Sequence, residues 1–236
     1  MTEFTKWRSL VDGEEISAIP DTSMFQSPLY QFTADLIGDA DGETVDFPEA
    51  IADLSDATAV NNPTFREDQD GYPAVEYDRE NEDAHDWTPD SQLPTGDDSH
   101  SIAALVHPRV GEQMVVFAYG DDEEESETRL EVDDSGELRH DFFNNNTDSG
   151  DETVNDSEWN TIGMSYDGSE RTLFINGESV STDTAGSVNV DDVNHAIARW
   201  RANDSRYFDG FISEVILSSD GESASAFEDY HNDRID

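Results

Sequence analysis

Apolar and polar residues alternate along most of the chain from residue 29 onward, and turn residues separate the alternating stretches. Alternation with a period of two places every second side chain on one face of a β-strand. No long stretch has the periodicity of a helix. The pattern predicts strands at residues 73–77, 101–106, 114–119, 128–132, 137–143, 160–166, 171–175, 178–182, 196–200 and 207–217.

Glycine-containing turns join several of these strands. Asp167-Gly168 and Asn176-Gly177 each separate two alternating stretches, and such dipeptides supply the positive φ angles that tight hairpins need. Residues 134–136 form a third turn of this kind. Many short strands at nearly regular spacing predict an antiparallel meander within a two-sheet sandwich.

The remaining segments are predicted from their polarity and spacing. Residues 223–232 carry apolar side chains about three apart, which predicts one short C-terminal helix on the sandwich. Residues 121–125 and 144–151 are polar and are expected to be solvated loops.

The N-terminal segment differs from the rest in charge. Its first ten residues hold Glu3 against Lys6 and Arg8, and Trp7 lies between the two cations. We therefore divide the chain into an arm at residues 1–26, a docking segment or an ordinary frayed terminus, and one domain at residues 27–236.

Composition changes the picture of the surface. The chain has 57 acidic and 12 basic residues, a net charge of −45, and Lys6 is its one lysine. Such a surface repels nucleic acid and anionic membranes. It resembles the surfaces of proteins from extremely halophilic archaea, in which concentrated salt screens self-repulsion, so we expect unfolding at low salt. A disordered acidic chain is the alternative, but 10% aromatic residues and the alternating runs favour folding.

Other features exclude several classes of protein. There is no cysteine, so the chain has no disulfide, thiolate metal site or cysteine nucleophile. No apolar stretch approaches the roughly 18 residues of a membrane helix, and the first residues do not read as an export signal.

Six segments in order resemble the laminin G-like domains of the concanavalin A-like lectin and glucanase group. They are residues 71–78 (GYPAVEYD), 101–108 (SIAALVHP), 158–162 (EWNTI), 166–168 (YDG), 173–177 (LFING) and 208–215 (FDGFISEV). The resemblance covers residues 28–232. It implies an all-β fold, a two-sheet antiparallel jelly-roll sandwich, which serves glycan or protein binding in many contexts and glycoside hydrolysis in some.

The same resemblance implies calcium, held by loop carboxylates at the rim of the sheet. Glu82 and Asp83 follow the GYPAVEYD strand and match the acidic segment of the family loosely. Glu214 is expected to share a strand face with Ile212 and Ile216, so its carboxylate needs a partner. That partner is calcium, or an arginine or backbone donors.

A ligand site is predicted just before the last strand, at Arg199, Trp200, Arg201, Arg206 and Tyr207. Aromatic faces stack on sugar rings and guanidinium groups bind carboxylates or sulfates, so this patch would select acidic glycans. The alternative is structural, with the arginines paired to Asp204 and Asp209.

We predict no catalytic residues. Glu131 and Asp133 superficially resemble the carboxylate motif of retaining glucanases, but residues 134–136 form a turn that would put Glu137 on the next strand. A glycoside hydrolase acting through Glu131 and Asp133 therefore remains as an alternative.

These features together predict a non-enzymatic surface module of a halophilic archaeal virus particle: a capsid decoration, turret, tail or attachment component. The module would be made in the cytoplasm, reach the virion surface, and bind host glycan or protein as a homo-oligomer. Residues 1–26 would contact other virion proteins. An extracellular adhesion protein of a cell, binding glycan, is a further alternative.

Overall fold

The structure of the chain, a computed structural model, describes residues 10–11, 14–15, 25, 27–37, 41–50 and 55–235. The predicted arm at residues 1–26 therefore falls almost wholly outside the described residues. Within the described part, no helix has the length and apolar character needed to cross a membrane.

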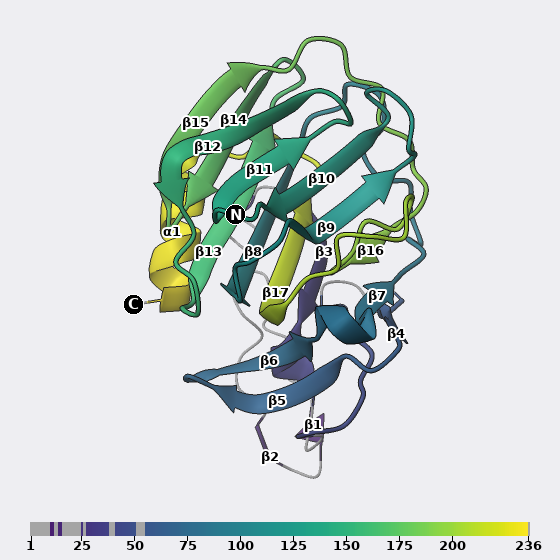
Figure 1. Cartoon of the computed structure of the whole chain (residues 1–236), viewed down its shortest axis with the longest axis vertical. Helices are drawn as coiled ribbons and strands as arrows, with labels where there is room; N and C mark the ends of the chain where they lie inside the picture. Colours follow the sequence, from purple (N-terminus) through teal and green to yellow (C-terminus); the bar gives the residue numbers. More distant parts are fainter. Residues whose placement is uncertain are drawn as a thin grey trace.

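Two antiparallel sheets form the body of the molecule (Figure 1). The first sheet has seven strands, in the order β12 (Asn146–Thr153), β11 (Glu137–Asp141), β10 (Glu127–Val132), β9 (Met114–Gly120), β16 (Ala196–Ile197), β7 (Ala84–Asp86) and β4 (Thr58–Val60).

The second sheet has eight strands. Seven follow the order β15 (Glu178–Thr184), β14 (Glu170–Ile175), β13 (Asn160–Tyr166), β8 (His100–Pro108), β17 (Gly210–Ser218), β6 (Tyr72–Tyr77) and β5 (Thr64–Gln69), and β3 (Pro28–Thr33) pairs with β17. The smaller elements are β1 (Leu10–Val11), which pairs with β2 (Glu14–Glu15), the 3-10 turns η1 (Ala34–Leu36) and η2 (Arg79–Asn81), and the helix α1 (Ala224–Ile235). The predicted jelly-roll sandwich with one C-terminal helix is confirmed.

The core lies between the sheets and follows from strand alternation. Ile162, Met164 and Tyr166 of β13 are buried in it beside Ile102 and Ala104 of β8. Because alternate side chains of β8 point to opposite faces, the residues between them point away from this core.

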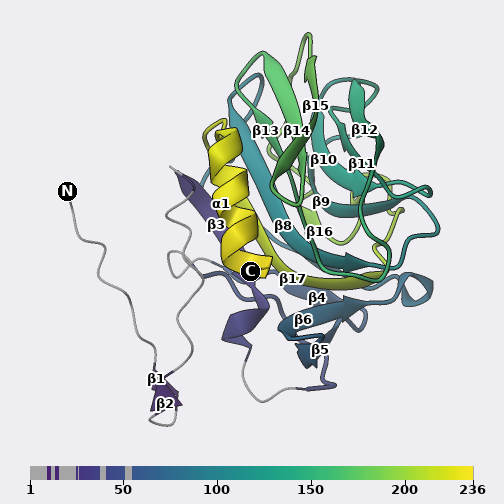
Figure 2. The same ribbon diagram turned by 90° about the vertical axis from the view of Figure 1, so that its left-hand side faces the viewer.

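Helix α1 covers the outer face of the eight-stranded sheet (Figure 2). Phe227 stacks on Phe174 with ring centroids 4.0 Å apart, and Phe25 meets Phe227 edge-on at 5.6 Å. Gly163 permits this approach, because a Cβ atom at that position would collide with the Phe227 ring. The predicted helix at residues 223–232 is thus confirmed as a cover of this sheet.

The strand predictions are correct for the central strands and fail at the polar ones. Residues 144–151, expected to be a solvated loop, lie mostly in β12, at the edge of the seven-stranded sheet. An edge strand pairs through its backbone on one side only and can have an exposed polar sequence, so hydrophobic alternation does not reveal it. The pattern also misses β3, β4, β5 and β7, and it extends β16 and β17 too far.

A bulge in β17 corrects the predicted orientation of Glu214. Ile212 pairs with Val106 but Glu214 pairs with the next residue back, so Ser213 is an extra residue in the strand. Ile212 consequently lies in the core between the sheets, and Glu214 does not share its face. Glu214 shares the face of Ile216, on the side of α1, as predicted.

A buried polar chain crosses the core between the sheets. His100 Nε2 lies 3.0 Å from the Thr128 hydroxyl, which lies 2.8 Å from His140 Nε2. Burial lowers the pKa of His100 to about 4 and lowers the pKa of His140 well below its ordinary value. Both rings are therefore neutral near pH 7, and a neutral ring costs less free energy to bury than a charged one.

Candidate ligand-binding site

The outer face of the seven-stranded sheet carries charged side chains from β10. Glu127, Arg129 and Glu131 occupy alternate positions and point outward, whereas Leu130 and Val132 point into the core. All three charged side chains are at most 1% exposed. Burial of charge at this level requires complete pairing.

Arg129 is the centre of a network that we call the charge hub: Glu127, Arg129, Glu131, Asp141, Arg139 and Arg206. Arg129 donates to Glu131 at 2.9 Å, to Asp141 at 2.8 Å and also to Glu127. Each of its three nitrogens therefore donates to a different carboxyl group.

Glu131 gathers donors from three other segments. It accepts hydrogen bonds from Arg206 at 2.9 Å and Gln113 at 2.7 Å, in addition to that from Arg129. Arg139 Nε lies 3.5 Å from its second oxygen. One buried carboxylate thus positions side chains from β11 and from the loops before β9 and β17.

Glu127 and Trp200 close one side of the charge hub. The indole nitrogen of Trp200 donates to Glu127, and the guanidinium groups of Arg129 and Arg206 lie 4.2 and 4.7 Å from the Trp200 ring centroid. Burial, together with the charges of Asp141 and Glu131, raises the pKa of Glu127 to about 8. The Glu127 carboxyl group is therefore mostly protonated at neutral pH.

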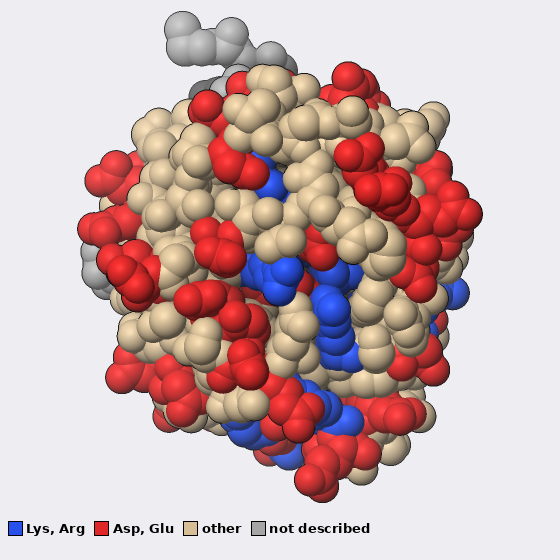
Figure 3. Space-filling model, turned by 45° about the horizontal axis from the view of Figure 1, so that its top comes forward, with Lys and Arg blue, Asp and Glu red and all other residues tan. Residues whose placement is uncertain are grey.

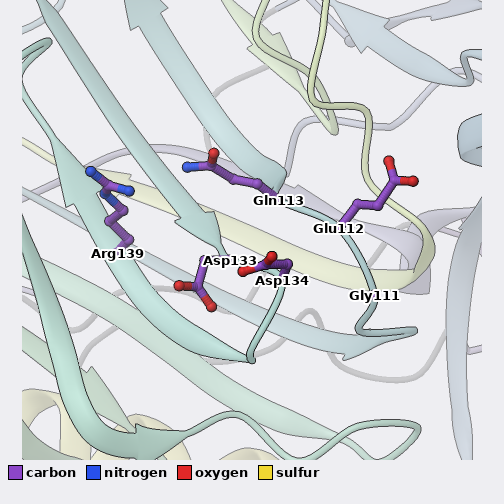
Figure 4. A pocket seen from close by; sticks show the side chains of 6 residues that line it. All are labelled: Gly111, Glu112, Gln113, Asp133, Asp134 and Arg139. Carbon is purple, nitrogen blue, oxygen red and sulfur yellow. The ribbon is translucent and has the colours of Figure 1, made fainter.

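A hollow of about 340 Å³ opens beside the charge hub. Its lining comes from the loop before β9, the turn after β10, and β11: Gly111, Glu112, Gln113, Asp133, Asp134 and Arg139. Figure 4 shows Gln113 and Arg139 on one side of the hollow and Asp133 and Asp134 on the other. Figure 3 shows the basic side chains gathered in the middle of this side of the molecule, with acidic side chains around them.

Arg139 has bonding capacity to spare. Its Nε atom is buried and has no hydrogen-bond partner among the described residues, and its side chain is 30% exposed. The Nε atom faces Glu131, so the groups left to donate to a ligand in the hollow are the terminal nitrogens of this partly exposed side chain.

The five residues predicted for ligand binding separate into two groups. Trp200 and Arg206 join the charge hub, as described above. Arg199 instead pairs with Asp86 at 2.6 Å and with Asp204 at 2.9 Å.

The other two predicted residues, Arg201 and Tyr207, contact the same two carboxylates as Arg199. Arg201 lies 3.3 Å from Asp86, and the Tyr207 hydroxyl donates to Asp204 at 2.7 Å. The structural alternative is therefore observed for Asp204, whereas Asp209 pairs with Arg109 at 3.0 Å.

The residues predicted to hold calcium do not come together around one point. Arg234 donates to Glu214 at 2.8 Å, and Gln31 donates to it as well. A guanidinium cation at this carboxylate does not fit a calcium ion. Asp83 accepts backbone hydrogen bonds from Asn62 at 2.9 Å and Asp78 at 3.2 Å.

Glu82 is the third predicted calcium ligand, and it is exposed in a left-handed conformation with φ of 58°. Among the described residues, no group of three His, Asp or Glu side chains is arranged to hold a metal ion. Calcium at Glu82 and Asp83 stays a prediction.

The two residues of the alternative hydrolase motif have different environments. Glu131 is buried in the charge hub, whereas Asp133 lines the hollow. One Asp133 oxygen also accepts from the backbone of Ser135 at 2.9 Å and of Glu137 at 3.0 Å, which caps the predicted turn.

Sequence reasoning missed Gln113, Glu127, Arg129, Arg139 and Asp141. The one signal for them was the spacing of Glu127, Arg129 and Glu131 at alternate positions, which places three charges on one strand face. Gln113, Arg139 and Asp141 carried no comparable signal, because strand pairing brings them in from other segments.

Comparison with known proteins agrees with the fold. Residues 64–224 match a laminin G-like family model described as the concanavalin A-like lectin/glucanases superfamily. No curated protein sequence matches.

Solved structures match at low sequence identity. Domain 4 of the arabinanase AbnA from Geobacillus stearothermophilus, in complex with arabinotriose, has a TM-score of 0.61 and 14% identity, covering 86% of this chain and 97% of that chain. The CBM40 of a Ruminococcus gnavus sialidase, bound to α2,3 sialyllactose, has a TM-score of 0.51 and 13% identity, covering 60% and 95%. A structure of botulinum neurotoxin type C, whose cell entry depends on two ganglioside molecules, has a TM-score of 0.62 and 7% identity, covering 89% and 52%.

Proposed function

Because the chain belongs to the concanavalin A-like lectin/glucanases superfamily, we propose that it is a glycan-binding module whose site is the hollow beside the charge hub. The observation that carries the proposal is Arg139, whose guanidinium group is held near Glu131 through Nε, is part of a side chain 30% exposed at the hollow, and has terminal nitrogens that make no hydrogen bond within the described residues.

The chemistry of the hollow suits sugar hydroxyl groups. A hydroxyl group both donates and accepts a hydrogen bond, so it pairs with a guanidinium donor on one side and a carboxylate on the other. Arg139 supplies the donors, and Asp133 and Asp134 supply acceptors across the hollow. Gln113 adds an amide whose nitrogen is already held by Glu131.

Glu131 is a positioning residue in this proposal. Its contacts to Gln113 and Arg139 hold two lining side chains in place before a ligand arrives. Such preorganisation lowers the entropic cost of binding. The arabinotriose, sialyllactose and ganglioside in the descriptions of the similar structures support a glycan as the ligand class.

Binding is tested by screening immobilised oligosaccharides in molar KCl and measuring the affinity of the best binder by calorimetry. Arg139→Met should weaken that affinity at least tenfold. The matched control is Arg66→Met, because Arg66 forms a half-exposed ion pair with Glu76 on the other sheet. Failure of the wild-type chain to bind any glycan, or equal affinities for wild type and Arg139→Met, would contradict the proposal.

We further propose that the module binds without cleaving its ligand. Glu127 and Glu131, the two glutamates of β10, are at most 1% exposed and are bonded to the chain's own side chains. Release of reducing sugar from the bound oligosaccharide, lost in Glu131→Gln, would instead support the hydrolase alternative.

We also propose a source and a location for the module. The net charge of −45 supports a halophilic source, and we place the module on the surface of an archaeal virus particle, attached through residues 1–26 and facing host glycan. Mass spectrometry of purified particles, envelope and cytosol, all kept in high salt, tests this placement. Recovery of the chain in cytosol alone would remove the virion role and leave the glycan site to be tested separately.

A further inference from the structure

The hollow contains more negative than positive charge. Its lining has three carboxylates, Glu112, Asp133 and Asp134, and one guanidinium group, that of Arg139. Arg79 lies 3.4 Å from Glu112 and offsets that carboxylate. Asp133 and Asp134 remain opposite Arg139, on the side of the hollow that a ligand must also contact.

The other arginines near this face are already committed to carboxylates. Arg129 and Arg206 are bonded to Glu131, and Arg199 is bonded to Asp86. Each of these guanidinium groups would have to give up an internal partner to bind a ligand carboxylate. Such an exchange removes one existing ion pair, a loss that is most unfavourable at the buried Glu131.

From this charge arrangement we propose that the hollow selects neutral oligosaccharides and discriminates against sugars that carry a carboxylate. The proposal rests on the proposed glycan-binding function and names the class of glycan. It reverses the expectation, drawn from the arginine-rich segment 199–207, that the ligand is acidic.

Neutral hydroxyl groups satisfy both sides of the hollow. Asp133 Oδ1 already accepts from the turn residues Ser135 and Glu137, which leaves Oδ2 to accept from a sugar hydroxyl. The same hydroxyl oxygen can accept from a terminal nitrogen of Arg139, whose side chain is 30% exposed and lines the hollow. A ligand carboxylate offers no hydrogen to Asp133 or Asp134 and places like charges in contact.

High salt does not remove this selection. At about 1 M ionic strength the Debye length is roughly 3 Å, so distant charges of the surface are screened. Groups in direct contact across a hollow remain inside that distance. The discrimination therefore depends on the lining residues and not on the net charge of the whole chain.

The test uses matched pairs of probes in 2 M KCl: lactose with 3′-sialyllactose, and a galactose oligomer with the corresponding galacturonate oligomer. The neutral member should bind at least tenfold more tightly in each pair that binds. Asp134→Asn should narrow that gap at least threefold, because Asp134 is exposed at the hollow and its oxygens cap no turn. The control is Glu178→Gln, the same loss of charge at an exposed position on β15.

The outcomes separate the two proposals. Tighter binding of the acidic members, or a gap that Asp134→Asn leaves unchanged, overturns the selection for neutral sugars and leaves glycan binding standing. Binding of no member of either pair, and of no glycan in the wider screen, overturns the glycan-binding function and this inference with it.

Discussion

The outer face of the eight-stranded sheet lies beneath α1, whereas the outer face of the seven-stranded sheet carries the charge hub and the hollow. Phe174 and Phe227 close the first face mainly by apolar contact, beside one buried ion pair between Arg234 and Glu214. On the second face each buried charge needs a partner, and Arg139 is left with a donor to spare. The helix covers the first face with groups of the same chain, and the second face leaves donors of Arg139 without a partner among the described residues.

The largest expected effect is on the charge hub. Arg129→Met removes the partner of three buried carboxylates and should lower the free energy of unfolding by about 4 kcal/mol. Denaturant titration in molar KCl measures this change, and Arg66→Met, which breaks a partly exposed pair, should cost less than about 1 kcal/mol. Similar losses in the two variants would show that the hub is no more important to stability than a surface pair.

The helix-covered face should respond to the loss of apolar volume. Phe227→Ala leaves a cavity against Phe25 and Phe174, with an expected loss of about 3 kcal/mol in the free energy of unfolding. Glycan affinity measured on the folded variant should stay within twofold of wild type, because the site lies on the opposite sheet. A large fall in affinity without unfolding would mean that the two faces are coupled.

The pH dependence distinguishes the hub from the core. The pKa of Glu127 is raised from 4.5 to about 8, so the unfolded chain loses this proton first and stability falls as pH rises through that window. Burial lowers the pKa of His100 and of His85 to about 4, which makes stability rise between pH 4 and 6.5 and then level off.

Between pH 6.5 and 8, Glu127 is therefore the one group of these three that makes the free energy of unfolding depend on pH. Wild type should lose about 2 kcal/mol over this range, and Glu127→Gln should lose almost none. Thermal or chemical unfolding at several pH values measures the slope, with Glu178→Gln as the control that retains it. A wild-type slope that persists in Glu127→Gln would exclude Glu127 as its source.

The smallest effect on stability and on glycan affinity is expected at Arg201, which does not line the hollow. Arg201→Gln breaks a 3.3 Å contact with Asp86 at a side chain that is 35% exposed, so stability should fall by less than about 1 kcal/mol. Glycan affinity should not change, because Arg201 does not line the hollow. A tenfold loss of affinity would return the binding site to the segment at residues 199–207.

Much of the fold could be predicted from local pattern. The alternation at Ile162, Met164 and Tyr166 correctly identified a core strand, and the positive φ angles of Asn176 and Gly177 confirm the predicted turn. The polar edge strand β12 was missed because it is held by backbone hydrogen bonds to β11, which require no hydrophobic alternation in its own sequence. The prediction that Glu214 shares a face with Ile212 was wrong because one extra residue, Ser213, reverses which face the following side chains occupy, whereas its shared face with Ile216 was correct.

The candidate site was predictable only in part. Arginine and tryptophan at residues 199–206 indicated a place where charge and aromatic rings meet, and Trp200 and Arg206 do meet the charge hub. Their partners could not be inferred, because a chain with 57 acidic residues offers many carboxylates to each arginine.

The sequence by itself determined the sandwich, its hairpins and the strongly acidic surface, since these follow from periodicity, turn chemistry and composition within short segments. Only the tertiary structure decided which charges pair. Glu131 receives donors from Gln113 and Arg206, positions that lie far apart along the chain and meet through strand pairing across the sheet. Because the energy of a buried charge depends on the groups within a few ångströms of it, the spare donor of Arg139 emerges only once every neighbour is in place.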